Sequence, residues 1–151
     1  MANTGFRIGG EEQEYVQLEI LRRAVPDASD YWDGNWLVAR ITVAVGAFRG
    51  AYEANVRADE LRDFSDELHR LQHELRGEAM FDTMEEQIKL HCVGDGYGHI
   101  QVQGEACDEA GVGNRLMFTL AVDQTDLQPT LRHLERALAE YPVRGAPERS
   151  G

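Results

Sequence analysis

Three scarcities limit what this chain of 151 residues can be. No apolar stretch approaches the roughly 20 residues of a membrane-spanning helix, which argues against an integral helical membrane protein. Its two cysteines are too few for the disulfide framework of a small secreted domain. Residues 1–10 lack the apolar segment of a secretory signal peptide, so we expect a cytoplasmic location.

The acidic residues that are present are concentrated. The formal net charge is −12. Residues 11–33 hold seven acidic residues against two arginines, and residues 59–86 hold ten against three. Such segments attract a basic partner and speed its encounter, although they are also typical of a solvated surface. They argue against nucleic acid or an anionic membrane as a direct ligand.

Residues 37–56 predict a hairpin whose register is fixed by its own pattern. Apolar residues alternate along both halves, and a two-residue turn at Gly46-Ala47 places Val45 opposite Phe48. The same register places Arg40 opposite Glu53, a favourable cross-strand pair. A slip of one residue would turn every side chain to the wrong face.

A second hairpin is predicted between residues 88 and 104. The apolar residues of the two strands lie on the same face only if the loop has three residues, Asp95-Gly96-Tyr97, which places Cys92 opposite Ile100. In this register Cys107 lies many residues from Cys92 along the sheet, so the two sulfurs cannot meet. We therefore predict two free thiols.

Two amphipathic helices complete the pattern, one opening at Asp59 and one before Pro142. Further alternating segments at residues 14–21 and 116–122 predict strands. The predicted fold class is α+β, with a single antiparallel sheet of about six strands (βββ-α-(β)βββ-α) and two helices packed on one face. The other face should be wet or bind a partner; it carries Arg40, Glu53, Arg57, Lys89, His91, Gln101, Gln103 and Arg115.

Both ends of the chain are rich in Gly, Pro, Ser or Arg. We expect a disordered N-terminal tail over residues 1–10, a single α+β domain over residues 11–141, and a flexible C-terminal tail over residues 142–151.

The sequence offers no catalytic constellation, so we predict that the protein is not an enzyme and has no cofactor. His69 and His73 have the i, i+4 spacing of metal ligands, but they lie opposite the apolar stripe of their helix, where a solvated face is the simpler interpretation. The Asp27–Asn35 loop is rich in oxygen ligands but lacks the spacing of a calcium loop. We therefore predict no metal site.

The segment Asp30-Tyr31-Trp32-Asp33-Gly34-Asn35-Trp36 stands out because aromatic residues flanked by aspartates are costly to expose. They either plug the end of the sheet core or anchor a partner. We favour the plug because Trp36 begins a strand.

This segment, together with Leu37 and Gly46-Ala47-Phe48-Arg49-Gly50, resembles a family of small bacterial proteins that includes WapI-like immunity proteins. The stretches Gly113-Asn114-Arg115-Leu116 and Asp123-Gln124-Thr125 are also similar, and the resemblance spans roughly residues 15–140. Family members of this type neutralise the C-terminal toxin of a cell-wall-associated, contact-dependent system. The resemblance implies a small cytoplasmic protein that binds a toxin, often a basic nuclease, and it implies no catalytic residues.

Three functions remain open. The first is a non-catalytic acidic binding protein, an immunity protein that occludes a basic toxin. The second is a structural or regulatory module that forms a homodimer through its open sheet face. The third is a small-ligand binder at the Asp27–Trp36 loop. For the first, the candidate partner-binding residues are Asp30, Tyr31, Trp32, Asp33, Asp63, Asp66, Glu67 and Glu74.

Overall fold

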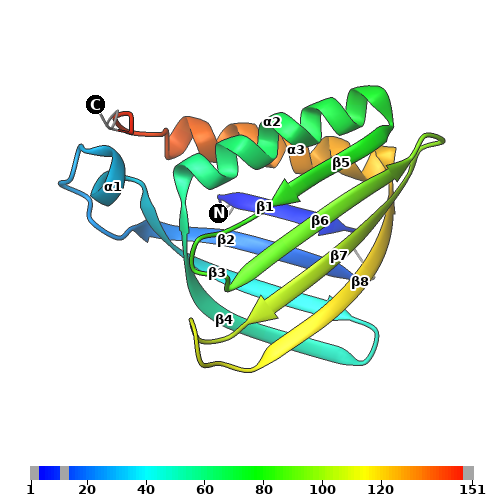
Figure 1. Ribbon diagram of the computed structural model, residues 1–151, viewed down its shortest axis with the longest axis horizontal. Helices are drawn as coiled ribbons and strands as arrows, with labels where there is room; N and C mark the ends of the chain where they lie inside the picture. The colour runs from blue at the N-terminus through cyan, green and yellow to red at the C-terminus, as the bar shows by residue number, and fades with distance from the viewer. Residues whose placement is uncertain (1–3, 11–13, 148–151) are drawn as a thin grey trace.

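A computed structural model of the protein describes residues 4–10 and 14–147. Within these residues the chain forms eight strands and three helices, in the order β1 (Gly5–Gly9), β2 (Tyr15–Arg23), α1 (Tyr31–Gly34), β3 (Trp36–Val45), β4 (Phe48–Arg57), α2 (Ala58–Glu74), β5 (Arg76–Phe81), β6 (Ile88–Asp95), β7 (His99–Cys107), β8 (Arg115–Asp123) and α3 (Gln124–Glu140). The course of the chain is shown in Figure 1.

The α+β class is confirmed, but the prediction of one sheet of about six strands is wrong. The described strands form two antiparallel sheets of four, β1-β2-β3-β4 and β5-β6-β7-β8. Helix α2 carries the chain from the last strand of the first sheet to the first strand of the second, so β4 and β5 are not paired. Alternation of apolar residues identifies a strand but does not say which sheet it joins.

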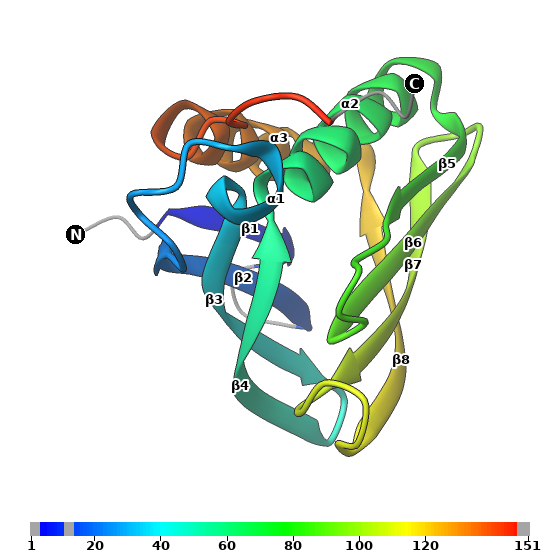
Figure 2. The same cartoon turned by 60° about the vertical axis from the view of Figure 1, so that its left-hand side comes forward.

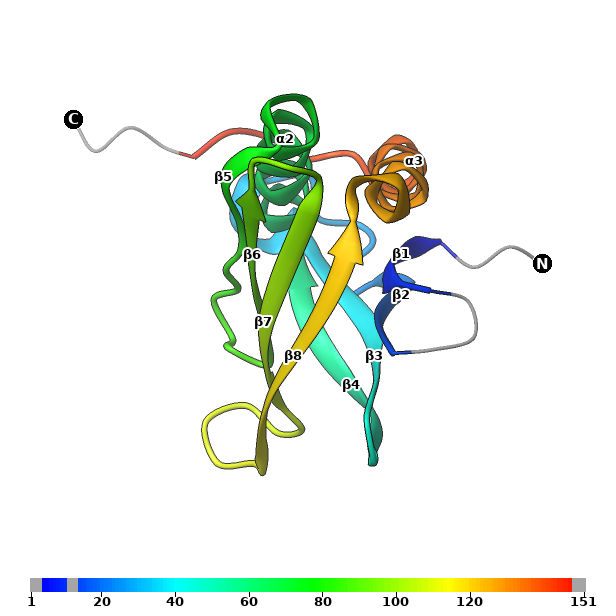
Figure 3. The same cartoon turned by 90° about the vertical axis from the view of Figure 1, so that its right-hand side faces the viewer.

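The two sheets diverge, and the long helices close the wider side of the space between them (Figure 2). Helix α2 packs against β5, α3 packs against β1, and the two helices contact each other (Figure 3). The helices therefore cover one edge strand of each sheet, β5 and β1, instead of one face of a single sheet. Such coverage also protects edges that would otherwise pair with other chains.

Three phenylalanines join the layers at the centre of the core. Phe6 of β1, Phe64 of α2 and Phe81 of β5 are buried, with ring centroids 5.2 to 5.6 Å apart. Aromatic pairs at this spacing contribute about 0.5–1.5 kcal/mol each beyond the burial of their area. The core is thus continuous from the first sheet through α2 to the second.

The β3–β4 hairpin has the predicted register. Val45 pairs with Phe48, and Arg40 pairs with Glu53. Gly46 has a φ of +55°, the left-handed conformation that the first turn position requires. The local pattern was therefore sufficient to determine this hairpin.

In the β6–β7 hairpin the predicted side chains share a face, but the pairing of the two strands is shifted by two residues. Cys92 faces Val102 instead of Ile100, and the loop is Gly96-Tyr97-Gly98. Asp95 causes the shift because its side chain accepts hydrogen bonds from the backbone N–H groups of Tyr97 and His99. Both cysteines are buried free thiols, as predicted.

Gln87 connects the two sheets between β4 and β6. Its side-chain amide accepts a hydrogen bond from the Asn55 backbone N–H at 3.2 Å and donates one to the Glu53 carbonyl at 3.3 Å. Its own carbonyl accepts from the Tyr52 hydroxyl and the Cys107 N–H. The side chain therefore occupies the place of a neighbouring strand along this part of the β4 edge.

The ends of the described chain are more structured than the predicted tails. Residues Gly5–Gly9 form β1, which pairs with β2 along its whole length, and Phe6 and Ile8 are buried. This strand was missed because it has only two apolar side chains between glycines. Arg144, placed in the C-terminal tail, donates its backbone N–H to the Asn35 side chain. Residues 1–3, 11–13 and 148–151 lie outside the described residues, and the single domain over residues 11–141 stays a prediction.

Candidate functional site

The aromatic-acidic segment forms α1, a single turn of helix beside the end of the first sheet. Asp30 is its N-cap and accepts a hydrogen bond of 3.1 Å from the Asp33 backbone N–H. Asp30 is therefore used locally to start the turn. Trp36 follows as the first residue of β3 and pairs with Arg57 at the end of β4.

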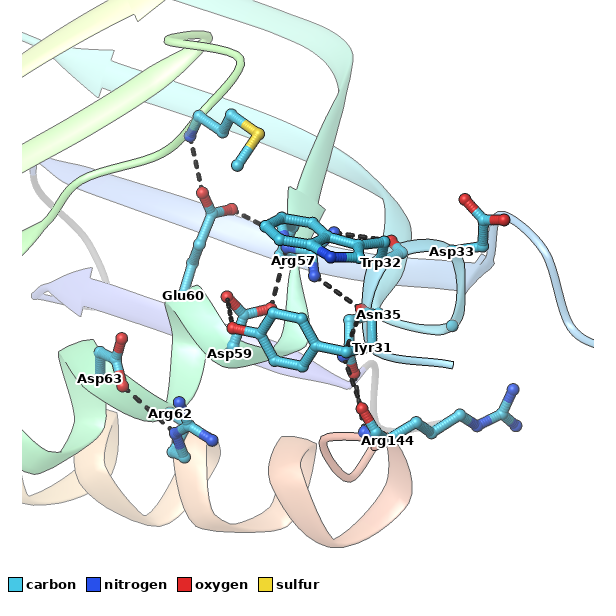
Figure 4. Close-up of polar contacts among 12 residues, drawn as sticks. Tyr31, Trp32, Asp33, Asn35, Arg57, Asp59, Glu60, Arg62, Asp63 and Arg144 are labelled. Atoms are coloured by element: carbon cyan, nitrogen blue, oxygen red, sulfur yellow. Dashed lines mark hydrogen bonds and ion pairs between the residues drawn. The ribbon is translucent and has the colours of Figure 1, made fainter. Parts of the chain in front are cut away.

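Arg57 lies beneath α1 and is 1% exposed (Figure 4). Its Nη1 and Nη2 donate to the carbonyls of Trp32 and Tyr31 at 2.8 and 2.7 Å, and its Nε pairs with Asp59 Oδ1 at 3.0 Å. The guanidinium carbon also lies 5.0 to 5.2 Å from the ring centroids of Tyr31, Trp32 and Trp36. Guanidinium groups bind well to aromatic faces at this distance.

The prediction that Arg57 lies on a wet sheet face is wrong. Arg57 pairs with Trp36 and does lie on the predicted polar face of the sheet, but α1 covers that face at this point. A buried guanidinium needs acceptors for its N–H groups, and the two loop carbonyls with Asp59 accept one hydrogen bond from each of its three nitrogens.

Two further arginines hold the same loop from other directions. Arg23, which is 9% exposed, donates through Nη1 to the Gly34 carbonyl at 2.7 Å. Arg144 donates through Nη1 to the carbonyls of Pro26 and Ala28 at 2.8 and 2.7 Å. Arginines from the end of β2, the end of β4 and the C-terminal segment therefore bind the backbone of residues 26–34 and fix its course.

Asn35 fastens the C-terminal segment to this loop. Its side-chain amide is fully buried; Nδ2 donates to the carbonyls of Tyr31 and Arg144, and Oδ1 accepts from the Arg144 backbone N–H at 2.8 Å. The loop is thus held from both sides, by the sheet and by residues that lie more than one hundred positions later in the sequence.

The three aromatic side chains have different surroundings. Tyr31 is half-buried and donates from its hydroxyl to Asp59 Oδ2 at 3.0 Å; burial and this bond raise the pKa of Tyr31. Trp36 is half-buried against Arg57. Trp32 packs edge-on against Tyr31 but remains 52% exposed. Tyr31 and Trp36 therefore pack around Arg57, and neither belongs to the core or to the side chains packed against it, so they do not form the predicted plug of the sheet core. Trp32 offers an open aromatic surface.

Glu60 links α1 to an acidic hollow beside α2. Its carboxylate accepts from the Arg57 backbone N–H at 2.7 Å and from the Met84 backbone N–H at 2.6 Å. Burial raises the pKa of the Glu60 carboxyl to about 7. The hollow has a volume of about 410 Å³ and is lined by Glu60, Asp63, Glu67, Met80 and Asp82.

The structure brings some of the candidate partner-binding residues together and separates others. Asp63 and Glu67 line the acidic hollow, and the exposed Asp33 points away from Arg57 (Figure 4). Asp66 lies close to His69, whose pKa it helps to raise, and Glu74 is the last residue of α2. Sequence reasoning missed Glu60, Met80, Asp82 and Met84; only Glu60 had a local signal, because it stands three residues after the N-cap of α2.

The described residues show neither a metal site nor a membrane-spanning helix. In residues 4–10 and 14–147, no group of three or more His, Cys, Asp or Glu side chains could hold a metal ion. His69 instead contacts Glu135 of α3 at 2.9 Å, and His99 contacts Asp95 at 2.8 Å. None of the helices described is long and apolar enough to cross a membrane.

The fold and the site define an acidic α+β protein with an aromatic surface loop whose backbone is bound by three arginines. The chain belongs to the immunity protein WapI-like family, whose model matches residues 7–142. No curated protein matches it. The resemblance read from the sequence is confirmed, and membership suggests an immunity role with a protein partner; proteins of this family are generally non-catalytic.

Proposed function

We propose that this protein is an immunity protein that binds a basic toxin domain in the cytoplasm and inhibits it by occlusion, without catalysis or a cofactor. Family membership is the observation that carries the proposal. The net charge of −12 supports it because a strongly acidic protein attracts a basic toxin and speeds the encounter.

The proposed contact residues lie on α1 and along α2. They are Asp30, Tyr31, Trp32, Asp33, Asp63, Asp66, Glu67 and Glu74. Asp63, Asp66 and Glu74 are exposed, so their charges are available to a partner. Occlusion requires only that the complex cover the active groove of the toxin.

Binding of a basic toxin domain, recovered by co-purification with the tagged protein from its native host and identified by mass spectrometry, tests the proposal. Calorimetric titration at low and high salt should give a complex that weakens as salt rises. The charge reversals Asp63→Lys, Asp66→Lys and Glu67→Lys should together lower affinity about tenfold or more. Glu109→Lys makes the same kind of change on an exposed residue of the β7–β8 loop and should have little effect. The absence of any complex at low salt would contradict the proposal.

A second candidate function is self-association, with the protein acting as a structural or regulatory module. It is favoured by exposed apolar side chains on the second sheet, where Val93 is 37% and Met117 is 74% exposed. Analytical ultracentrifugation distinguishes the two. A dimer that forms without any toxin and is lost in Met117→Lys would favour this second function.

A further inference from the structure

We propose that Trp32 is the apolar anchor of a docking surface that runs from α1 across Met84 to the acidic hollow beside α2, and that its occupant is a basic protein surface. This inference rests on the proposed function and names the part of the molecule that would meet the toxin. The docking surface, called the Trp32 surface, consists of Trp32, Glu60, Asp63, Glu67, Met80, Asp82 and Met84.

Trp32 is presented in a fixed position before any partner arrives. Its carbonyl is held by Arg57, its ring lies 5.2 Å from the Arg57 guanidinium carbon, and Tyr31 packs edge-on against it. Its backbone is further fixed because Arg23 and Arg144 bind the loop on either side. An interface built on such a loop loses little conformational entropy on binding. Tryptophan is also among the residues most enriched in binding hot spots.

Two exposed methionines extend the apolar part of this surface. Met84 is 58% and Met80 is 42% exposed. The Met84 N–H binds Glu60, and Glu60 in turn binds the Arg57 N–H, so a short hydrogen-bonded path joins Met84 to the support of Trp32. Methionine side chains adapt to the shape of a partner, which suits a contact beside a rigid anchor.

The charge around these apolar residues identifies the occupant. The acidic hollow has four carboxyl side chains and no basic side chain among the described residues that line it. Basic side chains reach two of these carboxylates only in exposed pairs, Arg62 with Asp63 at 3.2 Å and Lys89 with Asp82 at 3.9 Å, and exposed pairs are weak enough for a partner to displace. Lysine and arginine side chains would therefore find carboxylates beside apolar contacts for their methylene stems.

Other occupants fit less well. A second copy of the chain would bring another protein of charge −12 against the same carboxylates. Nucleic acid phosphates and anionic membranes would be repelled for the same reason. Arginine of a basic protein, by contrast, can also stack on the open face of Trp32.

The test is a calorimetric titration of the full chain with the basic toxin domain recovered by that co-purification, using matched pairs of variants. Trp32→Ala is compared with Tyr97→Ala, which removes an exposed aromatic side chain from the β6–β7 loop. Met84→Ala is compared with Met117→Ala on β8. We expect Trp32→Ala to weaken binding about 30-fold and Met84→Ala about fivefold, with changes below about twofold in the two controls. Urea unfolding of each variant checks that the fold is retained, and Trp32→Phe should recover part of the affinity.

The outcomes separate this inference from the proposed function. If the wild-type chain binds and Trp32→Ala binds equally well, the inference is wrong while the immunity role stands. If the wild-type chain does not bind at low salt, the proposed function fails and the inference fails with it. If Trp32→Ala instead converts a dimer of this chain into a monomer, the occupant is a second copy and the inference is overturned.

Discussion

Arg57 binds Trp32 in two ways at once: its Nη1 donates a hydrogen bond of 2.8 Å to the Trp32 carbonyl, and its guanidinium carbon lies 5.2 Å from the centroid of the Trp32 ring. One side chain therefore fixes both the backbone and the ring of the residue that we propose as the anchor. The stability of the loop and the presentation of Trp32 consequently depend on the same group.

Replacing Arg57 should destabilise the protein strongly. Arg57→Met leaves Asp59 without its ion-pair partner and the Trp32 carbonyl without its side-chain donor, while the Tyr31 carbonyl keeps only its bond from Asn35. Loss of one member of a buried pair costs about 3–5 kcal/mol, so we expect the free energy of unfolding to fall by about 3 kcal/mol. Urea denaturation followed by tryptophan fluorescence measures this, because Trp32 and Trp36 both lie against Arg57.

Arg62→Met is the matched control for Arg57→Met. Its pair with Asp63 is exposed, with side chains 45% and 62% accessible, and exposed pairs contribute about 0–1 kcal/mol. Equal effects of the two substitutions would show that burial of Arg57 does not contribute to stability.

The stability of the protein should depend on the protonation of Glu60. Burial raises the pKa of this carboxyl from 4.5 to about 7, so the folded state binds its proton more tightly than the unfolded state. Its contribution to the free energy of unfolding is therefore full below pH 4.5 and is lost as the pH rises through about 7. The loss amounts to at most about 3 kcal/mol.

Comparison of the wild type with Glu60→Gln isolates this contribution, because all other titrating groups are common to both proteins. Between pH 5 and 8, chemical denaturation should show the wild type losing stability relative to the variant. Parallel stability curves across this range would mean that Glu60 titrates at its ordinary pKa.

Asn35 should be needed to hold the C-terminal segment against α1. Asn35→Ala removes the donor to the Arg144 carbonyl and the acceptor of the Arg144 backbone N–H in a buried site, while the Tyr31 carbonyl keeps its bond from Arg57. An expected loss of about 1–3 kcal/mol follows from leaving such groups unpaired, and thermal unfolding measures it. Asn114→Ala removes an exposed bond to Asp108 and should change stability by about 0.5 kcal/mol or less. Faster exchange of loop amide hydrogens in Asn35→Ala alone would support the same account.

Gly104 should not tolerate a side chain. A Cβ atom at this position of β7 would lie 2.1 Å from Cζ of Phe118 on β8, so Phe118 would have to move within the core. Overpacking of this kind costs about 1–3 kcal/mol. Gly50→Ala on β4, where nothing lies within 4 Å, should be close to neutral. Similar denaturation midpoints for the two variants would contradict the prediction.

The sequence predicted local pairing well because pairing depends on neighbouring residues. The β3–β4 register follows from alternation and a glycine at the turn, and it was predicted residue by residue. The β6–β7 register was missed by two positions because the Asp95 side chain, not the apolar pattern, determines where the loop closes. The division into two sheets was missed because α2 separates strands whose patterns look alike.

The candidate site was harder to predict because it depends on contacts between distant segments. Alternation placed Arg57 on the correct side of its strand, but the α1 loop that covers it comes about 25 residues earlier in the chain. Asp30 was grouped with the partner-binding residues and proves to be the N-cap of α1. Met84 and Asp82 carried no recognisable pattern, since their exposure beside Glu60 depends on the packing of α2 against β5.

The hydrogen bonds between Asn35 and Arg144 also have a consequence for the order in which the protein is made. A chain synthesised from its N-terminus exposes α1 to the cell long before Arg144 leaves the ribosome, because 109 positions separate the two residues. The loop that carries Trp32 can therefore take its final form only after nearly all of the described chain has emerged. A nascent chain would be unable to engage a partner through this loop, so the delay would reserve binding for finished molecules.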